Sequence, residues 1–305
     1  MGRYALKRLG MALICLIGVS LIVFTAVRLT GDPTVLLLPE DAKEEDFVKL
    51  RTELGLDKPL PVQYLIYVRD MAEGNFGRSV RWKRPAAELV FGRLPATLQL
   101  AAFSMFLSVL LGLLGGVTAA RLKGSPWDTT VQLISSFGLS VPGFWLGIML
   151  ILIVAVKLHL LPTSGRGTFL HMILPAVTLA LHSASAMARL TRSSMLNVLG
   201  SDYIKMARVK GNPEWRVLWK HALKNASIPV VTLAGLQLAH KVGQAVIVET
   251  IFAWPGIGKL TIDAIYARDY AVVQASVLVV AATYISINIL VDLLYGYLDP
   301  QIRYD

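Results

Sequence analysis

Cysteine is nearly absent from this chain of 305 residues, and Cys15 in the first apolar stretch is its one example. One cysteine excludes an intramolecular disulfide and any zinc or iron–sulfur site built from several thiolates. Charged residues are also few, at 16%, whereas hydrophobic residues reach 55% and the mean hydropathy is +0.59. A soluble domain carries about 45–50% apolar residues. The surplus lies in long blocks, which favours membrane spans over a large soluble core.

Acidic residues are scarce as well. The 20 aspartates and glutamates stand against 30 lysines and arginines, so the net charge is +10. On a soluble protein this excess would suggest nucleic acid binding. Here the cations flank apolar blocks, and no basic stretch is interleaved with aromatic residues that could stack on bases. The charge therefore indicates membrane topology and contact with anionic lipid headgroups.

Six apolar blocks are long enough to cross a bilayer at about 1.5 Å per residue. The first block follows Arg3, Lys7 and Arg8 as in a signal peptide, but it is a full span without a small-residue cleavage site, so we expect a retained helix. Pro142-Gly143 predicts a kink or a break in the third block. The sequence thus predicts an all-α membrane protein with six transmembrane helices. They cover residues 9–29, 95–120, 131–157, 171–190, 226–250 and 275–297.

Lysines and arginines gather in alternate loops between these blocks. They precede the first block and follow the second, the fourth and the sixth. The richest loop, within 189–225, holds eight of them against Asp202 and Glu214. Because cytoplasmic loops carry an excess of Lys and Arg, this loop and both termini are predicted to be cytoplasmic in a cell inner membrane protein.

The chain is predicted to divide into four segments. Residues 1–29 hold the N-terminus and the first span, and residues 30–94 form an external, periplasmic segment. Residues 95–297 form the transmembrane domain with the basic loop, and residues 298–305 form a cytoplasmic tail. An amphipathic stretch at 61–71 predicts a helix in the external segment, which we expect to cap that face of the bundle.

The basic loop has the pattern of two short helices that meet at a corner. Ser201 can cap the first helix, and Asp202 lies in its first turn, where the helix dipole favours an anion. Gly211 can adopt the positive φ that ends a helix, and Asn212 can then cap a second helix that has Pro213 at its first position. From the residues alone, this pair either docks in a cleft of a soluble partner or lies on the lipid surface.

The loop resembles the cytoplasmic coupling loop of ABC importer permeases. In the general pattern of that family, Ala207, Gly211 and Leu223 match, whereas Lys205 stands in place of the glutamate and Lys224 in place of the proline. The form found here is similar to the peptide/nickel subfamily. The stretches that carry this resemblance are Gly31-Asp32-Pro33, Leu54-Gly55-Leu56-Asp57, Gly74-x-Phe76-Gly77-x-Ser79, Leu94-Pro95-Ala96-Thr97, Ala207-Arg208-x-Lys210-Gly211, Glu249-x-Ile251-Phe252-x-x-Pro255-Gly256 and Asp299-Pro300-x-Ile302-Arg303.

With these motifs the chain resembles the B-type permeases of dipeptide, oligopeptide, glutathione and nickel importers. The resemblance implies the type I ABC importer permease fold and a heterodimer with a second, homologous permease. It also implies an extracytoplasmic binding protein that delivers the solute, and two ATPase subunits that hold ATP and magnesium and contact the coupling loop. The loop residues expected at this contact are Asp202, Lys205, Ala207, Arg208, Lys210, Gly211 and Glu214.

Motifs for chemistry of its own are missing from the chain. No Gly-x4-Gly-Lys-Ser/Thr string is present. The nearest string, residues 256–259, is followed by Leu260 and is predicted to be an external turn before a short helix that runs to Tyr270. No His, Cys, Asp or Glu cluster has the spacing of a metal site. We therefore expect no enzymatic activity, cofactor or metal in this chain.

Polar side chains in the fifth block are candidates for the translocation path. Gln237, Lys241 and Gln244 are spaced by four and three residues, so they are predicted to share a helix face. Charged groups at bilayer depth usually face the protein interior or a wet cavity. Lys241 could contact a substrate carboxylate, pair with an acid on another helix, or snorkel. For His182 and Asp292 we expect a core hydrogen bond and an interfacial ion pair or cap, respectively.

Two other classes of protein fit the sequence less well. An ion-coupled secondary transporter is the alternative, but it would need an internal repeat and intramembrane acids, and the spans are nearly free of acids. A membrane-embedded enzyme would need paired catalytic carboxylates, a metal motif or an activated nucleophile, and the sequence supports none of them.

Overall fold

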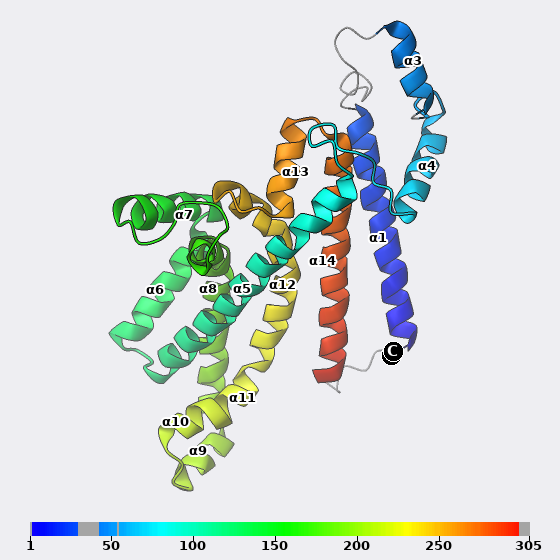
Figure 1. Cartoon of the computed structure of the whole chain (residues 1–305). Coiled ribbons are helices and arrows are strands. Elements are labelled where there is room, and N and C mark those ends of the chain that lie inside the picture. Colours follow the sequence, from blue (N-terminus) through cyan, green and yellow to red (C-terminus); the bar gives the residue numbers. More distant parts are fainter. Residues whose placement is uncertain (1, 30–42, 54, 299–305) are drawn as a thin grey trace. The chain divides into compact units, whose positions relative to one another are not determined.

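The computed structural model describes residues 2–29, 43–53 and 55–298. These residues form helices joined by loops, with an isolated bridge between Arg78 and Pro85 (Figure 1). The predicted all-α class is confirmed. The 31–33 and 299–303 motifs and nearly all of the predicted tail lie outside the described residues.

Within the described residues, five helices are long and apolar enough to cross a membrane, and a bent helix pair makes six if it counts as one span. Each of the five overlaps one predicted apolar block, but some extend well beyond it, since α5 begins at Ala86 rather than near residue 95. The five are α1 (Gly2–Leu29), α5 (Ala86–Arg121), α8 (Phe169–Leu199), α12 (Ile228–Ile251) and α14 (Tyr270–Leu298).

The expected third span, 131–157, is not one straight helix. α6 (Pro126–Ser140) ends before Pro142, and α7 (Gly143–Leu150) begins after it and continues as the π-helical turn η1 (Ile151–Lys157). The two arms bend by 110° at this break. Pro142 has no N–H with which to continue the ladder of α6, so the expected break occurs there.

The chain divides into two compact parts. In their described residues, the first part holds residues up to 96 and residues 255–289, and the second holds residues 97–254 and 290–298. The four segments expected from the sequence are defined by the side of the membrane rather than by compactness, so they stay a prediction.

In the first part, α4 (Leu60–Ala72) packs beside α1 and confirms the helix predicted at 61–71. The hydroxyls of Tyr64 on α4 and Ser20 on α1 share a hydrogen bond of 2.8 Å. The rings of Tyr64 and Tyr67 both lie against Phe24 of α1. Aromatic pairs of this kind add specific contacts to the apolar burial. This part also contains α3 (Glu44–Glu53).

The first part has its own apolar core, shared by the start of α5, α13 (Ile257–Tyr266) and α14. Beside this core, the buried carboxylate of Asp269 accepts hydrogen bonds from the Ser79 hydroxyl and the Arg81 backbone N–H. These bonds tie the loop before α5 to the start of α14. The short helix expected after the 256–259 turn is confirmed as α13, but it ends at Tyr266.

In the second part, α8 is the central helix (Figure 1). α6, α7 and α12 pack along it. α5 approaches it at glycines, because a Cβ at Gly112 would lie 2.5 Å from the Met187 Cβ and one at Gly116 would lie 2.4 Å from the Thr191 Cβ. Small residues allow such close packing in a membrane, where the hydrophobic effect does not drive helices together.

Candidate functional site

A cavity of about 370 Å³ lies where the third span breaks. Its walls come from the end of α6, the start of α7 and the facing turns of α8 and α12, and they include His182 and Gln244. A Cβ at Gly138 would lie 2.2 Å from the Ser185 Oγ, so the missing side chain lets α6 pass close to α8 before the chain turns at Pro142. Non-helical backbone within apolar spans is tolerated where it lines such a cavity.

Lys241 on α12 is fully buried, with 0% of its surface exposed. Its ammonium donates to the Leu179 carbonyl of α8 at 2.6 Å and to the Ser108 hydroxyl of α5 at 3.2 Å. It therefore joins three helices. Among the described residues it has no acidic partner, and its side chain is enclosed rather than extended toward solvent. Two neutral oxygens compensate the burial of this cation less well than a carboxylate would.

The three polar residues predicted on one face of α12 have different surroundings. Gln244 lines the cavity, Gln237 is half-buried, and Lys241 is enclosed by neighbouring helices. At about 100° per residue, positions 237 and 244 nearly coincide around the helix, whereas Lys241 is offset by roughly 40°. That offset places it between α5 and α8. The role of these residues in the translocation path stays a prediction.

The basic loop forms two helices at a corner, as predicted. α9 (Asp202–Val209) and α10 (Glu214–Arg216) meet at Gly211, whose φ is +78°. We call residues 201–216 the elbow. On its inner face, Ile204 is buried in a core with Met195 of α8 and Val117 of α5. The same core includes residues of η2 (Val217–Ala222) and α11 (Leu223–Ala226), which lead into α12. The elbow is therefore packed against the spans.

Two capping expectations are wrong. The Ser201 hydroxyl donates to the Val198 carbonyl at 2.6 Å instead of accepting a bond from α9. Asn212 does not cap the second helix, because its side-chain N–H donates to the Ala207 carbonyl at 2.9 Å and closes the end of α9. The left-handed backbone at Gly211 turns Asn212 back over that end. Pro213 then occupies the N-cap position of α10.

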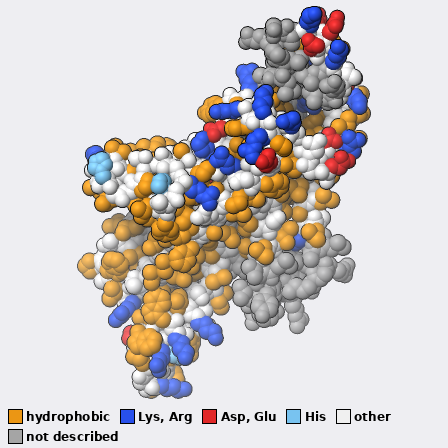
Figure 2. Space-filling model, viewed as in Figure 1, with side chains coloured by type: hydrophobic (Ala, Val, Ile, Leu, Met, Phe, Trp, Pro, Cys, Tyr) orange, Lys and Arg blue, Asp and Glu red, His pale blue; other side chains and the backbone are white. Residues whose placement is uncertain are grey.

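The outer face of the elbow exposes large apolar side chains. Val209 is 82% exposed and Trp215 is 61% exposed, and Tyr203 and Met206 are also exposed. Figure 2 shows hydrophobic side chains beside Lys and Arg in the region of the elbow, at the bottom of the view. Exposed apolar residues concentrated in one place mark interaction surfaces.

The charged residues predicted at the coupling contact are exposed as well. Arg208 and Glu214 form an ion pair of 2.9 Å across the corner, and Lys205 pairs with Asp202 at 2.8 Å. The hydrogen bond and charge from Arg208 hold the pKa of the Glu214 carboxyl below its usual range. Lys210 at the corner is exposed. The arrangement leaves the elbow rigid at its corner and accessible to a partner.

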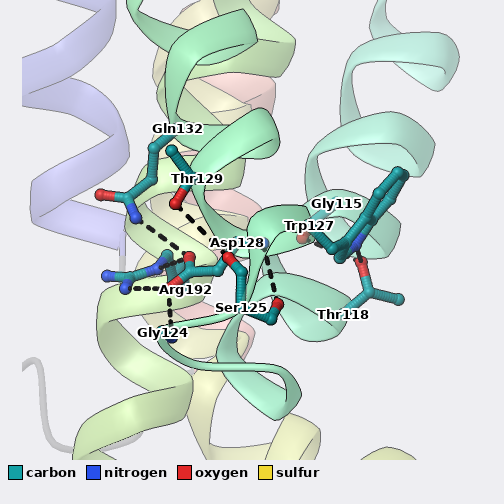
Figure 3. Close-up of polar contacts among 9 residues, drawn as sticks. All are labelled: Gly115, Thr118, Gly124, Ser125, Trp127, Asp128, Thr129, Gln132 and Arg192. Carbon is teal, nitrogen blue, oxygen red and sulfur yellow. Dashed lines mark hydrogen bonds and ion pairs between the residues drawn. The ribbon is translucent and has the colours of Figure 1, made fainter.

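An ion pair that the sequence did not reveal joins the buried Asp128 of α6 to the half-buried Arg192 of α8 (Figure 3). Arg192 donates to both carboxylate oxygens of Asp128, at 2.6 and 2.7 Å. The same carboxylate accepts bonds from the Gly124 backbone N–H and the Gln132 amide, each at 3.0 Å. The two charged residues are 64 positions apart, so no local pattern pairs them.

Metal binding receives no support from the geometry. Across the described ranges, no group of three or more His, Cys, Asp or Glu side chains could hold a metal ion. His182 lines the cavity at the broken span, and the roles expected for His182 and Asp292 stay predictions.

The apolar spans, the cavity at the broken span and the packed elbow define a membrane transport permease. The chain belongs to the family of binding-protein-dependent transport system inner membrane components, whose model matches residues 112–304. The model for the N-terminal segment of such membrane components matches residues 1–101. The chain is therefore the permease subunit of an ATP-driven, binding-protein-dependent importer and a multi-pass inner membrane protein.

Relatives match over nearly the whole chain. It is 41% identical to the dipeptide transport system permease protein DppB of Escherichia coli strain K12, over 99% of both proteins. It is 39% identical to the DppB protein of Alkalihalophilus pseudofirmus, also over 99% of both. It is 42% identical to the glutathione transport system permease protein GsiC of Salmonella typhi, again over 99% of both.

Solved structures share the fold. A chain of the inward-facing MetNI methionine ABC transporter matches with a TM-score of 0.58 at 22% identity, covering 69% of this chain and 96% of that chain. A chain of an amino acid ABC transporter matches with a TM-score of 0.52 at 15% identity, covering 70% and 94%. The predicted ABC importer permease architecture is confirmed, and the ion-coupled alternative receives no support.

Proposed function

We propose that this permease imports di- or oligopeptides or a related small solute, such as glutathione or a nickel chelate. The relatives that are 39–42% identical over their full length are dipeptide and glutathione permeases by name. Within this range, the binding protein that delivers the solute sets the choice. The affinity profile of the binding protein encoded beside this chain tests the substrate class, and a protein that binds none of these solutes contradicts it.

The proposed path passes the cavity at the broken third span. Gln244 and His182 give this cavity hydrogen-bonding groups at bilayer depth, and a second permease completes the passage. Gln237 lies two turns from Gln244 on the same side of α12. Lys241 is one turn away, and its neutral partners allow it to rotate toward a carboxylate-bearing substrate when the helices separate.

The elbow is the proposed contact for the ATPase subunits, and it is the observation that carries the coupling mechanism. Its inner face is anchored to α5 and α8 through Ile204, and its outer face presents Val209 and Trp215. A partner that grips the outer face therefore moves the spans as well. The charged residues around this contact are Asp202, Lys205, Arg208, Lys210 and Glu214, with Ala207 and Gly211 shaping the corner.

The proposed assembly contains a second permease, two ATPase subunits that bind ATP and magnesium, and a binding protein on the opposite face of the membrane. The basic loops support a cytoplasmic location for the elbow and both termini. Thiol labelling of single cysteines placed in the elbow, in intact and in opened vesicles, tests this orientation. Labelling in intact right-side-out vesicles by an impermeant reagent contradicts it.

Gly211→Val in the complete importer tests the coupling proposal. The strain is purely conformational, because a Cβ at Gly211 has no atom within 4 Å but must adopt a φ of +78°. We expect uptake to be lost while insertion and assembly of the complex persist. Gly211→Asn is the matched control, since asparagine tolerates this backbone region, and it keeps uptake. Unchanged uptake in the valine variant contradicts the proposal.

A further inference from the structure

A second cavity, of about 660 Å³, lies in the first part of the chain. Its walls come from α1, α4, the loop before α5 and the start of α14, and α4 lies beside α1 in Figure 1. Apolar side chains of Phe24, Val27 and Ile66 line it, together with Ala271 and Ala275. It shares no lining residue with the cavity at the broken third span.

Two buried polar atoms in the wall of this cavity lack a partner among the described residues. Gln63 is 8% exposed, and its amide N–H group donates to the carbonyls of Leu56 and Lys58 at 3.1 and 2.8 Å, which fixes the orientation of the amide. The Gln63 Oε1 and the Tyr67 hydroxyl are then left without hydrogen bonds. Burial raises the pKa of the Tyr67 hydroxyl, which therefore stays protonated. Buried polar atoms of this kind call for a ligand or water.

The cavity lies at a membrane boundary. Arg28 is the last residue but one of the apolar span of α1, and Tyr270 is the first residue of the span of α14. Both line the cavity, whereas α4 is not among the candidate spans. This depth corresponds to the layer of lipid headgroups.

The charge of the lining favours an anion. Arg28, Arg78 and Arg268 contribute three positive charges and Asp70 one negative charge, so the lining carries a net charge of +2. Asp70 is already paired with Arg69 at 3.0 Å. Arginines that face a pocket at the membrane surface are suited to phosphate groups.

We propose that this cavity binds the headgroup of a membrane glycerophospholipid. The phosphate lies against the arginines and accepts a bond from the Tyr67 hydroxyl, while a headgroup hydroxyl or ammonium donates to the Gln63 Oε1. The glycerol and the first acyl carbons contact Phe24 and the start of α14. Free phosphate matches the charge but leaves the apolar wall without a partner.

Native mass spectrometry of the complete importer, delipidated in detergent and then titrated with phosphatidylglycerol, tests this proposal. The double variant Tyr67→Phe, Arg268→Gln should bind this lipid about tenfold more weakly at one site per copy of the chain, because it loses a hydrogen bond and a charge contact. Gln63 is not mutated, because its amide N–H group donates to the carbonyls of Leu56 and Lys58 and a substitution would disturb the fold there. The matched control is Arg93→Gln, which removes an exposed arginine outside the cavity and keeps wild-type binding.

Inorganic phosphate is the competing probe in the same titration. We expect it to leave the lipid bound at equal concentration. Displacement at equal concentration overturns the proposal in favour of a simple anion site. Equal lipid binding by the double variant and the wild type overturns it as well. The readout is lipid binding rather than uptake, so neither outcome depends on the proposed transport function.

Discussion

Two cations in the second part of the chain, one half-buried and one fully buried, are held in different ways. Arg192 on α8 forms a two-pronged ion pair with the buried carboxylate of Asp128. Lys241 on α12 is more deeply buried, yet its partners in the described residues are the Leu179 carbonyl and the Ser108 hydroxyl. One cation is matched by an opposite charge, and the other is solvated by neutral oxygens.

We therefore call the Asp128–Arg192 pair the fixed joint between α6 and α8, and Lys241 the movable cation. Breaking the Asp128–Arg192 pair would leave the buried Asp128 carboxylate without its cation, which costs several kcal/mol. Lys241 gives up neutral hydrogen bonds when it moves, and a carboxylate can more than replace them. We therefore expect the ion pair to persist through the transport cycle and Lys241 to exchange partners.

The largest expected effect comes from breaking the fixed joint. Asp128→Ala leaves the Arg192 guanidinium without its acid and should destabilise the protein by about 2–4 kcal/mol, less than for a fully buried pair, because this guanidinium is half-buried. Thermal unfolding of the purified importer in detergent measures this loss. The double variant Asp128→Ala, Arg192→Leu should recover a large part of it, because no lone charge remains. A loss below about 1 kcal/mol for Asp128→Ala, the size typical of exposed pairs, would remove the distinction.

The fixed joint can also be strained without touching a charge. Gly116→Ala places a Cβ 2.4 Å from the Thr191 Cβ, next to Arg192, and should cost about 1–3 kcal/mol. Gly243→Ala on α12 is the matched control, because its Cβ meets no atom within 4 Å and alanine favours a helix. Unfolding midpoints compare the two variants. Equal midpoints would mean that the close approach of α5 to α8 does not support the joint.

Replacing the movable cation should affect transport more than stability. Lys241→Met has similar length and no charge, so we expect stability to change by less than about 1 kcal/mol. Uptake of a peptide with a free carboxylate should fall by about tenfold, the cost of one charge-assisted hydrogen bond, and uptake of the matching peptide amide should fall less. A loss of stability as large as that of Asp128→Ala would place both cations in the same class.

The smallest effect is expected at the exposed Arg208–Glu214 pair of the elbow. Because Arg208 lowers the pKa of Glu214, the pair adds stability above the ordinary glutamate pKa of about 4.3 and loses it as the pH falls below that range. Both side chains are well exposed, so the contribution is below about 1 kcal/mol. The protection factors of α9 amides in hydrogen exchange, which correct for the pH dependence of intrinsic exchange, should be constant between about pH 8 and 6, and Arg208→Gln should abolish their acid-dependent change. A change near neutral pH would contradict this assignment.

The sequence predicts the parts of this fold that depend on local patterns. Apolar blocks mark the spans, Pro142 marks the break in the third, and Gly211 marks the corner of the elbow. The 110° angle of the break depends on close packing at Gly138 against α8, which no local pattern reports. The sequence also does not predict which helix Asn212 caps, because its side chain can bond either to the end of α9 or to the start of α10.

Long-range partners explain what the sequence does not predict at the candidate site. The sequence pattern indicates that Asp128 is an acid in the first turn of a helix and that Arg192 is one cation of a basic loop. It does not indicate that the fold pairs them. Helical spacing groups Lys241 with Gln244, but an offset of roughly 60° decides whether a long side chain faces the cavity or the neighbouring helices. Only the packing of α5 and α8 resolves that choice.

We propose that ATP hydrolysis by partner subunits, transmitted through the elbow, drives import. The most direct measurement is uptake of a labelled dipeptide into proteoliposomes that contain the complete importer and its binding protein. We predict uptake with ATP on the side of the elbow, and no uptake with an ion gradient in the absence of ATP. Uptake driven by an ion gradient alone, with this chain reconstituted by itself, would contradict the account.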